Sequence, residues 1–319
     1  YTPRPVIQFM VAVTDPQLGE LLLDPACSTA GFLAEGFTHL EKQCKTVQHR
    51  KVLQEQSIRG GEAKPLPYML SQMNLLLHGL DAPAIEYGNS LAVKITELGE
   101  KDRVDVILTD PPFGGEEEAG IRSNFPADKQ TSETALLFLQ LIMRKLRKPG
   151  SNSERGGRAG VAARIKEEML KEFNLHTIVR LPNGVFAPYT SIPTNLLFFD
   201  RSGPTREIWY YELPLPEGRR NYSKTKPIQF EEFADCIKWF QMKRRKETDQ
   251  AWRVPVADVL EYDATGELVS CNLDLKNPNS AAALEHLPPV QLADDILVKE
   301  RRIIQILEEI KAELAGGQS

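Results

Sequence analysis

The sequence has no long apolar run, no cysteine pair at metal-binding spacing and no excess of basic residues. Lys, Arg, Asp or Glu interrupts every apolar stretch before the roughly 18 residues that a membrane helix needs, which excludes a membrane-spanning protein. Lys and Arg number 39 against 44 Asp and Glu, so no overall positive field predicts contact with nucleic acid. Any such contact must be local or come from a partner. Because 41% of the 319 residues are hydrophobic and Gly and Pro number only 21 and 22, we expect an ordinary globular fold.

The cysteines also exclude a class of protein. Cys27, Cys44, Cys236 and Cys271 form no C-x-x-C pair and have no clustered histidines beside them. We therefore expect neither zinc sites nor a disulfide framework, and we expect the four cysteines to be reduced thiols. The chain opens at Tyr1 without Met and without a secretory leader, so we expect upstream sequence to be missing and the location to be cytoplasmic.

Short apolar runs alternate with longer amphipathic runs, which predicts βα units and an α/β fold with a parallel sheet. Strands are expected at 19–24, 57–62, 104–109, 176–181, 194–200 and 207–212. Helices are expected at 31–44, 67–77, 133–146 and 162–173. In the second of these helices we expect the inward side chains to be Tyr68, Leu70, Met73, Leu76 and Leu77.

One strand is missing from this pattern. A doubly wound fold needs a strand between the helices at 133–146 and 162–173, but segment 151–160 is polar and rich in glycine. We expect residues to be absent from the sequence near Gly160, and a mobile loop is the alternative.

The composition changes after Pro214, toward charged and aromatic residues. We therefore expect a catalytic domain at 1–213, a C-terminal extension at 214–289 and a long terminal helix at 290–319 that contacts a partner. The extension holds Trp239, Trp252 and the basic run 243–246, which is interpreted as a solvated helix face, with phosphate contact as the alternative.

Two carboxylates follow the first two predicted strands, where open α/β sheets bind their ligands. Asp24 is followed by the small residues of 25–31, which open a helix and let backbone approach a ligand closely. Glu62 follows the second strand, where nucleotide-binding folds place an acid that accepts hydrogen bonds from ribose hydroxyls. A plain tight turn and a solvated glutamate are the alternatives at these two places.

The segment 110–113 follows the third strand and reads Asp-Pro-Pro-Phe. Two consecutive prolines fix φ near −65°, so the Asp110 carboxylate, the Pro111 carbonyl and the Phe113 ring leave the strand in set directions. Two oxygen acceptors beside an aromatic ring suit a planar amine whose nitrogen faces an electrophile. A simple strand terminator is the alternative.

Segment 24–33 resembles the S-adenosylmethionine loop of amino-methylating DNA methyltransferases, and segment 110–113 resembles their catalytic tetrapeptide. The order of the motifs is similar to that of the modification subunit of type I restriction–modification systems. The segments that carry this resemblance are 1–6 (YTPRPV), 24–27 (DPAC), 61–62 (GE), 74–79 (NLLLHG), 88–91 (GNSL), 110–114 (DPPFG), 181–186 (LPNGVF) and 272–274 (NLD).

The resemblance implies an adenine-N6 DNA methyltransferase of the gamma arrangement, with a doubly wound, mostly parallel sheet and S-adenosyl-L-methionine as cofactor. Cofactor binding is implied for Tyr1, Thr2, Pro3, Asp24, Ala26, Ser28, Thr29, Gly31, Phe32, Glu62, Asn89 and Ser90. The loop and Thr2–Pro3 would hold the methionine portion, Glu62 the ribose, and Asn89 would lie near the adenine. Catalysis is implied for Asp110, Pro111, Pro112 and Phe113, with Phe113 stacking on a flipped adenine. The implied partners are double-stranded DNA, a specificity subunit and a restriction subunit.

The chain departs from the family pattern at a few positions. Ser28 and Ala30 stand where glycines are usual, Asn89 where Asp is usual, and Asp110 where Asn is more frequent. Serine and alanine tolerate positive φ poorly, which predicts reduced cofactor affinity. An ionised carboxylate at position 110 accepts hydrogen bonds from an amine at least as well as an amide does. Family members also carry a helical region upstream of the position of Tyr1.

Other activities remain open. Cytosine-C5 methylation is disfavoured because it needs a cysteine nucleophile after a proline, and no cysteine here follows one. Cytosine-N4 methylation and protein-glutamine methylation use the same grip on an amine or amide. A scaffold without catalysis is the non-enzymatic alternative, and binding of S-adenosylmethionine distinguishes it from an enzyme.

Overall fold

The computed structural model describes residues 1–112, 114–147, 161–279 and 300–301. Residues Tyr1–Leu275 form one compact unit and Lys276–Ser319 a second, and the elements below belong to the first. Its helices are α1 (Arg4–Thr14), α2 (Gly31–Glu41), α3 (Val47–Gln56), α4 (Pro65–Leu77), α5 (Ala119–Arg122), α6 (Thr134–Lys145), α7 (Val161–Glu172) and α8 (Ala234–Phe240). None of the helices in the described ranges is long and apolar enough to cross a membrane.

The first sheet is fully parallel, with strand order β3-β2-β1-β4. Its strands are β1 (Leu22–Asp24), β2 (Ile58–Glu62), β3 (Ile85–Tyr87) and β4 (Val106–Ile107). Leu22 of β1 pairs with Ile58 on one side and with Val106 on the other. The prediction of an α/β fold with a parallel sheet is therefore confirmed. Since parallel strands point the same way, the residues that follow β1, β2, β3 and β4 share one edge of the sheet.

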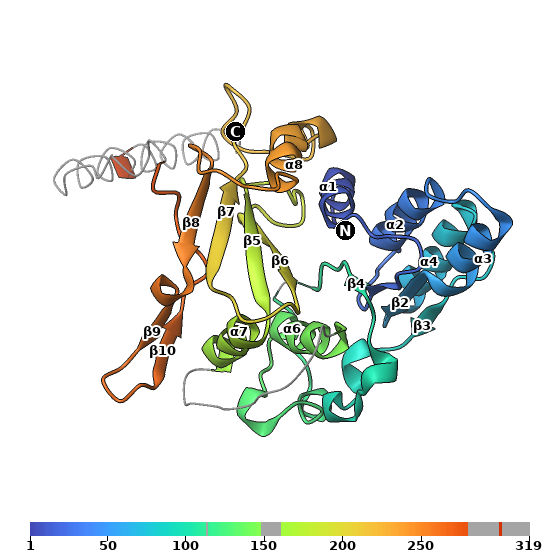
Figure 1. Ribbon diagram of the computed structural model, residues 1–319, viewed down its shortest axis with the longest axis horizontal. Helices are drawn as coiled ribbons and strands as arrows, with labels where there is room; N and C mark the ends of the chain where they lie inside the picture. Colours follow the sequence, from blue (N-terminus) through green and yellow to red (C-terminus); the bar gives the residue numbers. More distant parts are fainter. Residues whose placement is uncertain (113, 148–160, 280–299, 302–319) are drawn as a thin grey trace, which may run out of the picture. The chain divides into compact units, whose positions relative to one another are not determined.

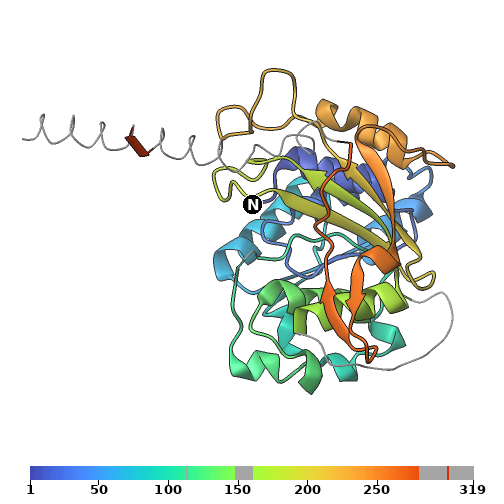
Figure 2. The same cartoon turned by 90° about the vertical axis from the view of Figure 1, so that its left-hand side faces the viewer.

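The second sheet is mixed, with strand order β6-β5-β7-β8. Its strands are β5 (Asn174–Leu181), β6 (Thr194–Asp200), β7 (Glu207–Glu212) and β8 (Ala251–Pro255). β5 is parallel to β7 and antiparallel to β6, and β7 is antiparallel to β8. Helices α6 and α7 lie side by side in both views, and α7 packs on β5 (Figure 1, Figure 2). A short hairpin of β9 (Leu260–Tyr262) and β10 (Leu268–Cys271) follows.

No strand of the described residues joins the first sheet to the second. A doubly wound fold needs a strand between α6 and α7, and the sequence of this segment predicts none. Residues 148–160 lie outside the described residues. The predicted terminal helix at 290–319 also lies outside them, apart from Glu300 and Arg301.

Helix α1 was not predicted, and it places the first residues of the chain beside the parallel sheet. Pro3 is its N-cap, and its buried face includes Val6 and Phe9, both fully excluded from solvent. The Phe9 ring stacks on that of Phe233 at a centroid separation of 4.5 Å. Because α1 is held by this core, the residues just before it are fixed relative to the strand ends.

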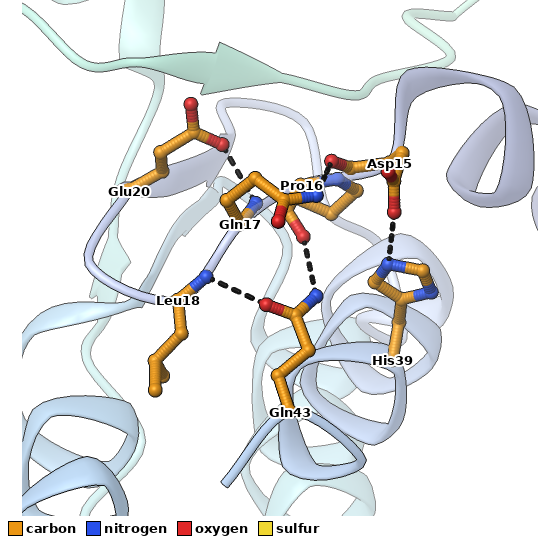
Figure 3. A network of polar contacts seen from close by, with 7 residues as sticks. All are labelled: Asp15, Pro16, Gln17, Leu18, Glu20, His39 and Gln43. Carbon is orange, nitrogen blue, oxygen red and sulfur yellow. Dashed lines mark hydrogen bonds and ion pairs between the residues drawn. The ribbon is translucent and has the colours of Figure 1, made fainter.

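The connection from α1 to β1 is tied to α2 by side chains (Figure 3). Gln43 accepts a hydrogen bond from the Leu18 amide at 2.9 Å and donates one to the Pro16 carbonyl at 2.9 Å. His39 Nε2 lies 2.9 Å from Asp15 Oδ1. The loop polar groups are thus satisfied by α2 and the residues just after it, which fixes where β1 begins relative to α1.

Helix α4 corrects one prediction. Met73, Leu76 and Leu77 were expected to face inward, yet they are 52%, 51% and 85% exposed. The side chains that α4 buries are Ser71 and Leu75. Apolar residues surround most of this helix, so helical spacing alone does not say which stripe meets the core.

Candidate functional site

A cavity of about 620 Å³ lies at the shared edge of the parallel sheet, within the usual size range of small-molecule sites. Residues that follow each of β1, β2, β3 and β4 line it. The lining residues that had been predicted from the sequence are Tyr1, Thr2, Asp24, Ala26, Ser28, Thr29, Gly31, Phe32, Glu62, Asn89, Ser90, Asp110, Pro111 and Pro112. The small-residue turn and the Asp-Pro-Pro corner therefore face one space.

One predicted cofactor-binding residue, Pro3, is not among those that line the cavity. Pro3 instead caps the N-terminus of α1. Phe113, the predicted stacking residue, lies outside the described residues.

The turn after β1 is fastened to the end of β2. The Ser28 amide donates to Glu62 Oε2 at 2.9 Å, and the Cys27 amide donates to the Gly61 carbonyl at 2.9 Å. Ser28 and Ala30 have φ of +49° and +62°, in the left-handed region. The positions where glycine was expected therefore do require positive φ, and here they carry side chains that strain it.

Asp24 is 2% exposed at the base of this turn and accepts a hydrogen bond from the Ala26 amide at 3.1 Å. Burial raises the pKa of Asp24 to about 7, and the carboxylates of Asp110 and Glu62 add smaller upward contributions. Burial also raises the pKa of the Cys27 thiol, so this cysteine is a protonated, unreactive neighbour of the site.

The backbone passes very close to the turn at Gly61. A Cβ at this position would lie 2.5 Å from Ser90 Oγ and 3.3 Å from the Pro25 carbonyl oxygen. Ser90 Oγ donates to that same carbonyl at 2.6 Å. The ends of β1, β2 and β3 are thus held together at a point where a side chain does not fit.

Asp110 follows β4 and also lines the cavity. The Thr2 hydroxyl donates to Asp110 Oδ2 at 2.6 Å. Burial raises the pKa of Asp110, and the Thr2 hydrogen bond acts in the opposite direction because it stabilises the ionised form. Pro111 and Pro112 line the cavity beside it.

Several lining residues were not singled out from the sequence. They are Ile7, Pro25, Cys27, Gly61, Ala63, Lys64, Pro67, Gly88, Glu117, Thr134, Phe138, Phe186, Tyr189 and Thr190. Glu117 sits in a run of three glutamates that reads as solvated surface, and Thr134 and Phe138 belong to the amphipathic helix α6. Segment 181–186 did carry the family resemblance, which was the available signal for Phe186. The described residues contain no group of three His, Cys, Asp or Glu side chains placed to hold a metal.

The basic run 243–246 is not a helix face, which corrects that interpretation. α8 ends at Phe240, and the run folds back over its end. Arg245 donates to Thr177 Oγ1 at 2.6 Å, and its guanidinium carbon lies 4.6 Å from the centroid of the Phe240 ring. Lys243, Arg244 and Lys246 are exposed, so three of the four cations face solvent.

Comparison with known proteins defines the class that this fold and cavity indicate. Residues 1–270 match the family model described as N-6 DNA Methylase. The chain belongs to this family. It is 47% identical over 311 residues to the type I restriction enzyme EcoEI methylase subunit of Escherichia coli, an alignment that covers 92% of this chain and 60% of that protein.

Solved structures agree with this assignment. A modification subunit from Vibrio vulnificus YJ016 superposes with a TM-score of 0.84 at 62% identity, covering 90% of this chain and 61% of that one. A chain from a structural study of complex assembly in the type I R-M system superposes with a TM-score of 0.78 at 41% identity, covering 100% of this chain and 66% of that one. The chain thus spans about three fifths of the length of these relatives.

Proposed function

We propose that this chain transfers a methyl group from S-adenosyl-L-methionine to the N6 amine of adenine in DNA, as the catalytic part of a type I modification subunit. The observation that carries the proposal is the shared cavity: the turn after β1 and the Asp-Pro-Pro corner after β4 line one space. Methyl transfer needs the donor and the acceptor amine within one site, in line with each other.

The residues present fit S-adenosylmethionine. The strand ends supply backbone without side chains at Gly61, where a Cβ would collide with Ser90. Glu62 has one oxygen bound to the Ser28 amide and the other to the Lys64 amide at 2.7 Å, which orients its remaining lone pairs toward ribose hydroxyls. The bound cofactor supplies an electrophilic methyl carbon on a sulfonium. Negative carboxylates around the cavity favour that positive charge.

Binding of the target adenine amine is assigned to Asp110 and the Pro111 carbonyl. Each accepts one hydrogen bond from the adenine amine, which turns the nitrogen lone pair toward the methyl carbon. The bound cofactor would supply the methyl group, and Asp110 and the Pro111 carbonyl would hold the amine while it exchanges one proton, released to solvent, for that methyl group. Phe113 is assigned to stack on the adenine, which must leave the duplex to reach this site.

The finer organisation is part of the same proposal. We infer the doubly wound sheet of S-adenosylmethionine-dependent methyltransferases, a catalytic domain at 1–213, an extension at 214–289 and a partner-contacting segment at 290–319. The partners are double-stranded DNA and the specificity and restriction subunits of a type I complex. Because the specificity subunit chooses the sequence, the recognition site is not encoded in this chain.

The test uses the assembled complex of this chain with its specificity subunit, DNA and isotopically labelled S-adenosylmethionine. Mass spectrometry of the DNA should find the label on adenine N6, and label on cytosine N4 or on no base would overturn the assignment. Asp110→Ala and Phe113→Ala should abolish transfer with the fold intact. Asp110→Asn should retain transfer within about tenfold, because an amide oxygen still accepts from the amine. Calorimetry should detect binding of S-adenosylmethionine to the chain. A scaffold without catalysis would bind none.

A further inference from the structure

Three polar side chains form a hydrogen-bonded group on the cavity wall. Glu117 Oε2 accepts from Asn89 Nδ2 at 3.2 Å, and Glu117 Oε1 accepts from Thr134 Oγ1 at 3.2 Å. All three residues line the cavity. Asn89 Oδ1 accepts from the Leu91 amide at 2.9 Å, so its oxygen is held by the backbone and its amino group points at Glu117.

The position of this group in the sheet indicates which part of the cofactor it meets; this step rests on the proposed function. Asp110 follows β4 at one edge of the strand order β3-β2-β1-β4, Glu62 is the last residue of β2, and Asn89 follows β3 at the other edge. A cofactor with its methyl carbon near Asp110 and its ribose at Glu62 extends its base toward the end of β3. Asn89 and its partner Glu117 therefore meet the adenine.

We propose that Glu117 binds the exocyclic amine of the cofactor adenine and selects a 6-aminopurine. That amine is a donor and needs an acceptor. Asn89 presents an amino group, which is a donor, and Ser90 directs its hydroxyl hydrogen to the Pro25 carbonyl. A carboxylate oxygen accepts more than one hydrogen bond, so Glu117 keeps acceptor capacity beyond its bonds to Asn89 and Thr134. Asn89 and Thr134 are positioning residues that fix the Glu117 carboxylate at the wall.

The experiment measures the Kd of the full chain by calorimetry for two ligands, S-adenosylmethionine and an analogue whose purine carries hydrogen in place of the 6-amine. The unaltered chain should bind S-adenosylmethionine about 10- to 100-fold more tightly, the range expected for a hydrogen bond to a charged group. Glu117→Ala should weaken the binding of S-adenosylmethionine by that factor and leave the Kd of the analogue unchanged. The two Kd values should therefore become similar.

Two further variants separate this role from a structural one. Glu118→Ala removes the neighbouring exposed glutamate, which makes no side-chain cap bond to α5, and should preserve the ratio of the two Kd values. Thr134→Val removes one donor to Glu117. It should weaken the binding of S-adenosylmethionine several-fold and leave the Kd of the analogue unchanged. A Glu117→Ala chain that binds S-adenosylmethionine and keeps the full preference would overturn this inference alone. Failure of the unaltered chain to bind S-adenosylmethionine would overturn the proposed function as well.

Discussion

The Thr2 hydroxyl donates a hydrogen bond of 2.6 Å to Asp110, which is 108 residues away in the chain. The bond fixes one carboxylate oxygen, and the other is the oxygen to which we assign the target amine in the proposed function. It also stabilises the ionised carboxylate, whose pKa is raised by burial. This pair therefore links the segment before α1 to the corner after β4.

Replacement of Thr2 should change the pH dependence of methyl transfer. Thr2→Val removes the donor, so the pKa of Asp110 rises further and the acid limb of kcat/KM moves to higher pH. Thr2→Ser keeps the hydroxyl and should keep the limb in place. The measurement is the pH profile of the assembled complex. An acid limb that is the same in Thr2→Val as in the unaltered chain would show that the hydrogen bond does not control Asp110.

Asp24 should make the chain less stable as the pH rises. Its folded-state pKa is raised to about 7, whereas its unfolded value is near 4, so the folded chain holds the proton more tightly. The stabilisation is complete below about pH 4 and is lost as the pH rises through 7, with a total on the order of 4 kcal/mol.

The matched variants for this pH effect are Asp24→Asn and Asp81→Asn, the second at an exposed loop position. Urea unfolding at several pH values between 4 and 8 should show that Asp24→Asn loses most of the downward slope. Asp81→Asn should follow the unaltered chain. An unchanged slope in Asp24→Asn would assign the pH dependence to another group.

Ser28→Gly should stabilise the turn after β1. Ser28 has φ of +49°, where an L-residue with a Cβ is strained and glycine is not. We expect up to about 1 kcal/mol of added stability, reduced by the greater freedom of glycine in the unfolded chain. Ala26→Gly, in the same turn but outside the left-handed region, should instead cost about 0.5–1 kcal/mol. Equal losses in both variants, measured by denaturant unfolding, would argue against strain at Ser28.

Gly61→Ala should disrupt the cavity. Its Cβ would lie 2.5 Å from Ser90 Oγ and 3.3 Å from backbone at Pro25, so the turn must move. We expect a loss of about 1–3 kcal/mol in stability and weaker S-adenosylmethionine binding. Gly120→Ala is the control, because a Cβ there has nothing within 4 Å and alanine favours helix α5. Unchanged binding by Gly61→Ala would mean that the cofactor does not depend on this close approach.

The sequence predicted three of the four strands whose ends line the cavity, because their signals are local, but it did not predict β3. Apolar runs ending in Asp24, Glu62 and Asp110 marked strands and their carboxyl ends, and parallel strands bring such ends to one edge. β6 and β7 match their predicted ranges, 194–200 and 207–212. β4 is shorter than predicted, with Val106 and Ile107 alone in the ladder.

Other features depended on packing between distant segments. Helical spacing described α4 without deciding that Leu77 faces solvent, and charge alone did not show that Arg245 packs on Phe240 and Thr177. The local sequence pattern predicted an α/β chain with acids at the ends of its strands, because strand and turn propensities act over a few residues. Only the tertiary structure placed Thr2 on Asp110 and Glu117 on Asn89, since hydrogen bonds between remote residues exist only after the chain has folded.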